Sequence, residues 1–250
     1  MKRRHIPDSI KMQLRQEAFF GCAECGSPIL EFHHIIPWSE KQHNDVDHMI
    51  ALCPTHHTSL GEMHPSKCYA LKKNPYNLRK GFLRGMLGTN KNFSAFDIGG
   101  NTFINTPTIL EYYGKPIIQY KVFRKQVLLS AYIPEKDFWP SLEIVENEVT
   151  VNRKQAWDIV FRTNLLKLVR LDKSFFEIDL RKDEAKISGK IEIGGQTFEF
   201  TPKYMNIPSF TAQQCTFKNL STALSIGDGN HTVHWPNFAM ATPRPIFTRI

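Results

Sequence analysis

The chain has 250 residues and a formal net charge of +8, with 41% hydrophobic and 22% charged residues. These values predict a soluble globular protein of one large domain or two ordinary ones, with a buried core. They exclude a membrane-spanning chain, because no apolar run approaches the length of a span. The basic start, residues 1–5, precedes a polar segment rather than an apolar signal core, so we expect a cytoplasmic protein.

The positive charge is concentrated toward the N-terminus. Residues 1–94 carry thirteen Lys/Arg against eight Asp/Glu, or +5, and the other 156 residues carry nineteen against sixteen, or +3. A basic region is typical of proteins that bind polyanions. The N-terminal part is therefore expected to face phosphate groups.

Cysteines and histidines are grouped in the same region. Eight of the ten histidines lie at or before His64, and three of the five cysteines lie in CxxC and CxxH pairs. In a chain without a signal peptide, such pairs favour metal ligation over a disulfide framework. Cys68 and Cys215 lie outside the pairs and are expected to be small core residues.

In chain order, residues 7–20 read as a helix with Asp8 or Ser9 as its N-cap, ended by Gly21. The spacing of Cys22 and Cys25 lets one tight turn direct two thiolates at a tetrahedral ion. A strand is expected to start at 29–32 and to continue into two adjacent histidines, before Pro37 stops it. Adjacent side chains on a strand point to opposite faces, so these histidines can have different roles.

Residues 38–47 are polar and read as a loop, and the apolar run 49–52 leads to Cys53 and His56, a second metal half-site. A helix is expected from about His57 to residue 61. Segment 64–92 is rich in Lys and Arg and reads as one or two basic helices with a turn at 74–77. Such a face is either solvated or in contact with phosphates.

After about residue 94, β-type segments dominate. They are 117–123, 127–133, 142–145, 149–151, 156–161 and a hairpin, 190–193 with 196–200, joined by Gly194 and Gly195. The second part is therefore mainly β: a sandwich, a barrel or a stacked sheet. We expect an α+β protein with domains at 1–93 and 94–250.

The stretch 15–64 resembles the HNH endonuclease family, the zinc-stapled branch of the ββα-metal nucleases. Three motif parts carry the resemblance: Cys22-x2-Cys25, His33-His34-Ile35-Ile36-Pro37, and Leu52-Cys53-x2-His56-His57. The resemblance implies a structural Zn²⁺ site, with the ligands Cys22, Cys25, Cys53 and His56. It also implies His34 as general base, and His33 and His57 as ligands of a catalytic divalent ion, Mg²⁺, Mn²⁺ or another.

The implied reaction is hydrolysis of nucleic-acid phosphodiester bonds, most readily in double-stranded DNA, leaving a 5′-phosphate and a 3′-hydroxyl. The family also suggests defence against foreign DNA. His48 stands where the family usually has an Asn that fixes the loop of the base, with Asn44 as an alternative. Expected nucleic-acid contacts are Lys41, Lys72, Lys73, Arg79 and Lys80.

Two other functions stay open: a nucleic-acid-binding module without cleavage, and a nuclease restrained by a β domain that senses a small molecule or protein. A homodimer and a protein partner are further expectations, and no membrane partner is expected. His43 and His64 read as solvent-exposed loop residues, and Trp157 as part of the β core. His231 and His234 are expected to have no catalytic role.

Overall fold

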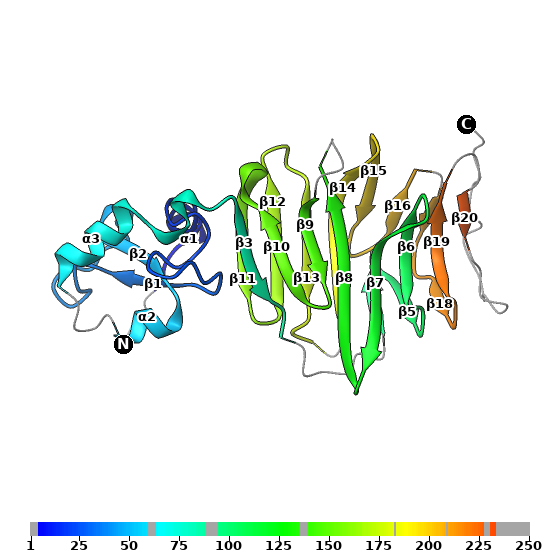
Figure 1. The fold of residues 1–250 in the computed structure, drawn as a ribbon, viewed down its shortest axis with the longest axis horizontal. Helices are drawn as coiled ribbons and strands as arrows, with labels where there is room; N and C mark the ends of the chain where they lie inside the picture. Colours follow the sequence, from blue (N-terminus) through cyan, green and yellow to red (C-terminus); the bar gives the residue numbers. More distant parts are fainter. Residues whose placement is uncertain are drawn as a thin grey trace.

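The computed structural model describes residues 5–59, 64–88, 95–135, 140–182, 184–208 and 210–227, and the backbone of 231–233. A small unit that carries the helices forms one end of the long axis, and two layers of strands form the rest (Figure 1). The mixture of helices and predominant strands agrees with the α+β expectation. None of the described helices is long and apolar enough to cross a membrane.

The small unit is built around an antiparallel strand pair, in which His33 lies opposite Ile50 and His34 opposite Met49. Helices α1 and α3 contact β2, and α2 contacts both strands. In chain order the elements are α1 (Asp8–Glu17), β1 (Glu31–His34), η1 (Val46–His48), β2 (Met49–Leu52), α2 (Pro54–Ser59), α3 (Pro65–Lys73) and η3 (Tyr76–Arg79).

The ends of α1 differ from the prediction. Its N-cap is Pro7, whose φ of −57° suits a helix start, so neither Asp8 nor Ser9 caps it. The helix ends before Gly21 because Phe19 and Phe20 have positive φ angles of 51° and 63°. The strand expected to start at Ile29 begins at Glu31 and runs to His34, so both histidines lie on it as expected. Helix α2 begins at Pro54, three residues earlier than expected.

The large unit is a two-layer β structure, which is one of the expected architectures. The first sheet, in spatial order, holds β20 (His231–Val233), β19 (Thr222–Ile226), β6 (Thr108–Tyr112), β7 (Lys115–Phe123), β8 (Gln126–Pro134), β9 (Pro140–Val145), β10 (Glu148–Asn152) and β3 (Phe82–Met86). The second holds β11 (Ala156–Arg162), β12 (Leu165–Arg170), β13 (Phe175–Asp179), β14 (Ala185–Ile193), β15 (Gln196–Phe200), β16 (Met205–Ile207) and β17 (Phe210–Ala212), with β4 (Phe96–Ile98), β5 (Asn101–Ile104) and β18 (Thr216–Lys218) attached.

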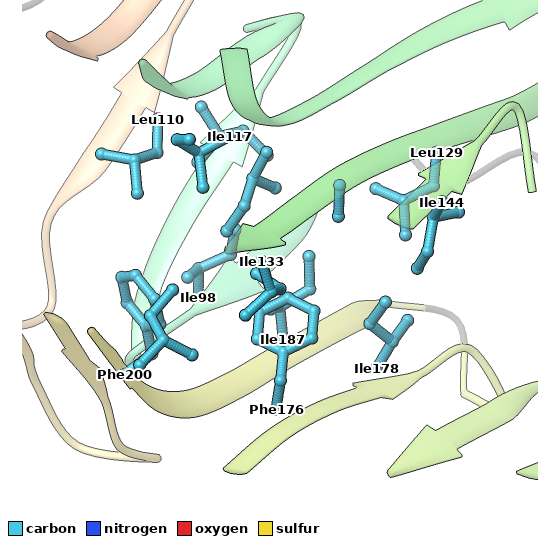
Figure 2. Close-up of a cluster of buried hydrophobic side chains, with 14 of the residues drawn as sticks. Ile98, Leu110, Ile117, Leu129, Ile133, Ile144, Phe176, Ile178, Ile187 and Phe200 are labelled. Carbon is cyan, nitrogen blue, oxygen red and sulfur yellow. The ribbon is translucent and has the colours of Figure 1, made fainter. Parts of the chain in front are cut away.

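The two sheets bury a continuous apolar core between them. Figure 2 shows Leu129 and Ile144 of one sheet above Ile178 and Phe176 of the other. The strands alternate buried and outward residues, and β14 does so along its whole length. The predicted glycine hairpin is confirmed, with Ile193 opposite Gln196 and φ angles of 58° and 78° at the two glycines.

Segment 64–92 is not wholly helical, which corrects the expectation of a basic helical extension. Residues Phe82–Met86 form β3, which pairs with β10 at the edge of the first sheet. Its alternation of exposed and buried side chains, with Leu83 buried, fits a strand better than a helix. The domain division at 93/94 stays a prediction. Strand β3 lies before this boundary but pairs with β10, which lies after it.

Polar contacts join the small unit to the second sheet. Arg15 of α1 donates two hydrogen bonds to the carboxylate of Asp158 on β11, at 2.8 and 2.6 Å. Gln16 donates to the carbonyl of Trp157. Trp157 itself is 48% exposed, so its expected place in the β core is wrong: its side chain lies on the outward face of β11.

Candidate functional site

Three thiols and one imidazole converge at the predicted zinc ligands. The ligand atoms of Cys22, Cys25, Cys53 and His56 all lie within 4.8 Å of one another. The Sγ atoms of Cys22 and Cys53 are each 3.4 Å from His56 Nδ1, and those of Cys25 and Cys53 are 3.9 Å apart. A tetrahedral zinc site requires about 3.8 Å between sulfurs and about 3.6 Å from sulfur to nitrogen. The four side chains can therefore hold a zinc ion.

The turn that carries the first two cysteines is fixed from both sides. The Gly26 amide donates to the Cys22 carbonyl, and the Ala23 amide donates to Ala51 on β2. Asn77 of η3 is 3% exposed and donates to the carbonyls of Phe19 and Gly26. A Cβ at Gly21 would lie 2.2 Å from the Asn77 amide nitrogen, so the close packing requires glycine there.

The thiols of Cys25 and Cys53 have pKa values shifted in opposite directions. Burial raises the pKa of the Cys25 thiol to about 12. Desolvation acts in the same direction on Cys53, but hydrogen bonds, first that from the His56 amide, lower its pKa overall. With no cation nearby, Cys25 is a neutral thiol at pH 7, and a bound ion shifts it to the thiolate that ligates metal.

A second cluster lies on one face of β1. The rings of His33 and His57 are 5.3 Å apart between centroids, at 77°. Glu31, two residues before His33 and so on the same face, has Oε2 3.0 Å from His57 Nδ1. Burial lowers the pKa of His33, and the charges of His57 and His34 lower it further. His33 is therefore neutral at pH 7, as a metal-binding imidazole must be.

His34 lies on the opposite face of β1 and is 9% exposed. Its Nε2 is 3.0 Å from the carbonyl oxygen of His43. A carbonyl only accepts, so Nε2 carries the proton and Nδ1 is the basic nitrogen of the ring. The Trp38 ring packs edge-on at 5.3 Å and helps to fix the imidazole plane.

His43 is buried, at 9% exposure, so the expectation of a solvent-exposed loop residue is wrong. Its ring closes the loop that follows β1: Nδ1 accepts from the Asp45 amide at 3.1 Å, and Nε2 donates to the Ile36 carbonyl at 3.2 Å. These two bonds hold in place the backbone carbonyl that accepts from His34. Sequence reasoning missed this role because a histidine in a polar stretch carries no sign of burial.

His48 packs edge-on against His43, with ring centroids 6.0 Å apart, but neither its ring nor the Asn44 side chain contacts the His43 carbonyl in the described structure. His48 Nδ1 is 2.8 Å from the Tyr69 hydroxyl on α3, and its Nε2 is 3.9 Å from a carboxylate oxygen of Asp45. Asn44 donates to the carbonyl of His5. The loop-fixing role expected of His48 thus stays a prediction, and the geometry favours His43 for it.

The residues predicted to contact phosphate differ in solvent exposure and in ion pairing. Lys41, Lys73, Arg79 and Lys80 are exposed. Lys80 Nζ lies 5.4 Å from the centroid of the Tyr76 ring. Lys72, by contrast, is paired with Glu17 of α1, and its side chain is 16% exposed. The pair neutralises this lysine, which makes it a structural contact and weakens its expected role toward phosphate.

The remaining expectations concern residues outside both clusters. His64 is exposed and caps α3 by accepting from the Ser66 amide, and Cys68 is buried as expected. Cys215 packs partly buried against the sandwich core. The side chain of His231 and all of His234 lie outside the described residues.

Comparison with known proteins identifies the N-terminal segment. The model of a family described as HNH endonuclease matches residues 22–62, a range that contains both clusters. The resemblance is therefore confirmed for this segment. No curated protein and no solved structure matches the chain.

Proposed function

We propose that the chain is a metal-dependent endonuclease that hydrolyses phosphodiester bonds of double-stranded DNA. His34 is the general base, and His33 and His57 hold the divalent ion. The observation that carries the proposal is the hydrogen bond from His34 Nε2 to the His43 carbonyl. It fixes the orientation of a nearly buried imidazole on the same strand that carries His33.

His34 acts by taking a proton from the attacking water. The His43 carbonyl accepts from Nε2 throughout, so the positive charge that develops on the ring is stabilised as the proton arrives at Nδ1. His43 is the positioning residue of this pair, because its own ring bonds to Ile36 and Asp45 fix the carbonyl. The loop is thus arranged before the substrate binds.

The donor set at His33 and His57 suits a catalytic ion. The Glu31 carboxylate lies 3.0 Å from His57 Nδ1 and so favours a proton on that nitrogen, which leaves Nε2 as the metal-binding nitrogen. Two neutral imidazoles leave coordination positions open for water and phosphate oxygens. A divalent ion there would neutralise charge that grows on the scissile phosphate and the leaving oxygen.

The thiol-rich site is closed, unlike the open site at His33 and His57. Three cysteines and His56 complete a tetrahedron, so this site has no open position and serves the fold. Exposed Lys41, Lys73, Arg79 and Lys80 are proposed to contact the DNA backbone. A role in defence against foreign DNA is proposed on the family resemblance alone.

A cleavage assay tests the proposal. Supercoiled plasmid is incubated with the full chain and Mg²⁺ or Mn²⁺, and His34→Ala is compared with His64→Asn, which keeps a helix-capping side chain. We expect nicked or linear DNA with the wild type and with His64→Asn. The cleavage rate should fall by about 10²-fold or more with His34→Ala. Equal cleavage by both variants would contradict the assignment of the base.

The alternative, a binding module that does not cut, is distinguished by the same experiment. If the wild type shifts DNA in a gel but cuts with neither ion, while His34→Ala binds equally well, the binding function holds. The family match favours the enzyme.

A further inference from the structure

A strip of exposed side chains runs from η3 onto β3, the strand of the first sheet that lies next to the small unit (Figure 1). Its aromatic members, Tyr76 and Phe82, are each 52% exposed. Its cations, Arg79, Lys80 and Arg84, are exposed as well. We call these five residues the η3–β3 strip. All of them lie beyond residue 62, where the match to the family model ends, so that match assigns them no role.

The Tyr76 ring is held in place by the turn that carries the first two zinc ligands. The Tyr76 amide donates to the carbonyl of Ala23 in that turn, at 2.8 Å. A Cβ at Gly26 would lie 2.6 Å from Tyr76 Cδ1, so the ring packs directly on this glycine. A ring that is already fixed loses little conformational freedom when a flat ligand stacks on its exposed part.

Strand β3 continues the strip with two side chains on its outward face. Phe82 and Arg84 point to the same side, because alternate residues of a strand do so, and they are about 6.8 Å apart along it. Leu83 between them is 2% exposed and anchors the strand in the core. Pairing with β10 places Phe82 opposite Asn152 and Arg84 opposite Thr150, so the neighbours across the strand pair are uncharged.

The cations of the strip are available to an anionic partner. Arg79, Lys80 and Arg84 form no ion pair in the described part of the chain. The strip ends at Arg84, because the next outward residue of β3, Met86, lies opposite the acidic Glu148. Aromatic rings interleaved with unpaired cations are complementary to a nucleic-acid strand, in which bases alternate with phosphates.

The two rings favour an unpaired strand over a duplex. In a duplex the bases stack on one another and present only their edges in the grooves. In an unpaired strand each base has a free face, which an exposed aromatic side chain can cover. Tyr76 and Phe82 therefore gain stacking contact only from a single strand.

We propose that the η3–β3 strip binds single-stranded DNA. Bases stack on Tyr76 and Phe82, and the three cations of the strip neutralise the phosphates between them. In the proposed nuclease, the strip holds an unpaired segment beside the duplex that is cut, and in that respect the inference rests on the proposed function. The binding itself uses none of the three histidines of the proposed catalytic centre.

Fluorescence anisotropy of the full chain, without added Mg²⁺ or Mn²⁺, tests the binding. The probes are a short labelled oligothymidylate, an abasic strand of the same length, which has the phosphates but no bases, and a blunt duplex. We expect the oligothymidylate to bind about tenfold more tightly than the abasic strand, because only its bases can stack.

Two substitutions separate stacking from charge. Phe82→Ala should weaken binding of the oligothymidylate about tenfold and leave the affinities for the abasic strand and the duplex nearly unchanged. Phe82→Tyr keeps a ring and should bind as the wild type does. Arg84→Gln should weaken binding of both single strands. It should also reduce the slope of log K against log salt concentration by about 0.7, as expected for one phosphate contact fewer with a single strand.

Phe123→Ala is the matched control, since Phe123 on β7 is 56% exposed and Arg124 Cζ lies 5.3 Å from its ring centroid. It should leave all affinities unchanged, and thermal unfolding should show that all variants are folded. The proposal is overturned if the oligothymidylate binds no more tightly than the abasic strand, or if Phe82→Ala weakens binding no more than Phe123→Ala. Clearly tighter binding of an oligouridylate would overturn the choice of DNA.

These outcomes are distinguishable from failure of the proposed function, because no measurement depends on cleavage. A chain that binds as expected but does not cut plasmid retains the strip and loses only the nuclease proposal. A chain that cuts plasmid but binds the two single strands equally loses only the strip.

Discussion

The two regions of the molecule are stabilised by different means. Among the described residues, the apolar cluster of the small unit has seven buried members, and three of these are cysteines, Cys22, Cys53 and Cys68. The cluster between the two sheets has thirty-nine, including six fully buried phenylalanines. Apolar burial is therefore extensive in the sandwich and small in the small unit, so we expect only the small unit to need a bound ion for its stability.

Removal of zinc is the strongest way to test this difference. Structural zinc sites contribute about 10–16 kcal/mol of apparent binding free energy, which is folding free energy. A chelator, or Cys53→Ser, should therefore unfold the small unit while the sandwich stays intact. Hydrogen exchange should show loss of protection in β1 and β2 and none in β7 and β8.

Cys215→Ser is the matched control, because Cys215 is a cysteine of the sandwich and lies outside the metal cluster. It should retain about one zinc per chain by elemental analysis. Protection of β1 and β2 that survives complete removal of zinc would contradict the dependence on metal.

Local patterns in the sequence predicted much of both regions. Pair spacing indicated the four zinc ligands because a CxxC or CxxH turn is formed by neighbouring residues. Alternation and the Gly194–Gly195 pair predicted the hairpin for the same reason. The family motif indicated His33 and His34, which lie on β1, and His57, which lies on α2 after β2.

Contacts between distant residues were not predictable in this way. Nothing near Arg15 indicates that its partner is Asp158, 143 residues away. The neutralisation of Lys72 by Glu17 depends on the packing of both α1 and α3 on β2. Glu31 was missed as well, although its place two residues before His33 on an alternating strand was a usable signal.

The Arg15–Asp158 pair joins the two regions. Breaking it should have the next largest effect on stability, after removal of zinc. Both side chains are 12% exposed, and their contact is bidentate. Arg15→Ala leaves a nearly buried carboxylate unpaired, which costs about 3–5 kcal/mol. We expect a lower unfolding midpoint in urea and faster exchange of α1 amides.

The exposed pair Arg181–Asp179 is the control, since its contact is also bidentate but Arg181 is half exposed. Arg181→Ala should change stability by less than about 1 kcal/mol. The double variant Arg15→Met with Asp158→Leu should recover most of the loss. If the double variant is no more stable than Arg15→Ala, the unpaired carboxylate is not the cause of the lost stability.

His43→Phe tests how the small unit fixes its proposed base. The ring volume is nearly kept, but the bonds to Asp45 and Ile36 are lost, so the carbonyl that orients His34 becomes mobile. Misplacing a catalytic group by about 1 Å costs up to about 10²-fold in rate. We expect kcat to fall by about 10–100-fold while KM for DNA is unchanged. His48→Phe is the comparison. If kcat falls more in His48→Phe than in His43→Phe, His48 rather than His43 fixes the loop.

Glu31→Gln should have the smallest effect, because it changes only how His57 is held. The amide oxygen of the variant can still accept from His57 Nδ1, but without the negative charge the imidazole becomes a weaker ligand. Loss of such a supporting partner reduces metal affinity about 10–100-fold, and a conservative change should lie near the lower end. The Mn²⁺ concentration for half-maximal cleavage should therefore rise about tenfold, with kcat at saturating Mn²⁺ nearly kept. Glu40→Gln, in the exposed loop, should leave that midpoint unchanged. Glu31 is not one of the expected zinc ligands, so the zinc content of Glu31→Gln should also be unchanged. If Glu31→Gln and Glu40→Gln require the same Mn²⁺ concentration for half-maximal cleavage, Glu31 does not support the metal centre.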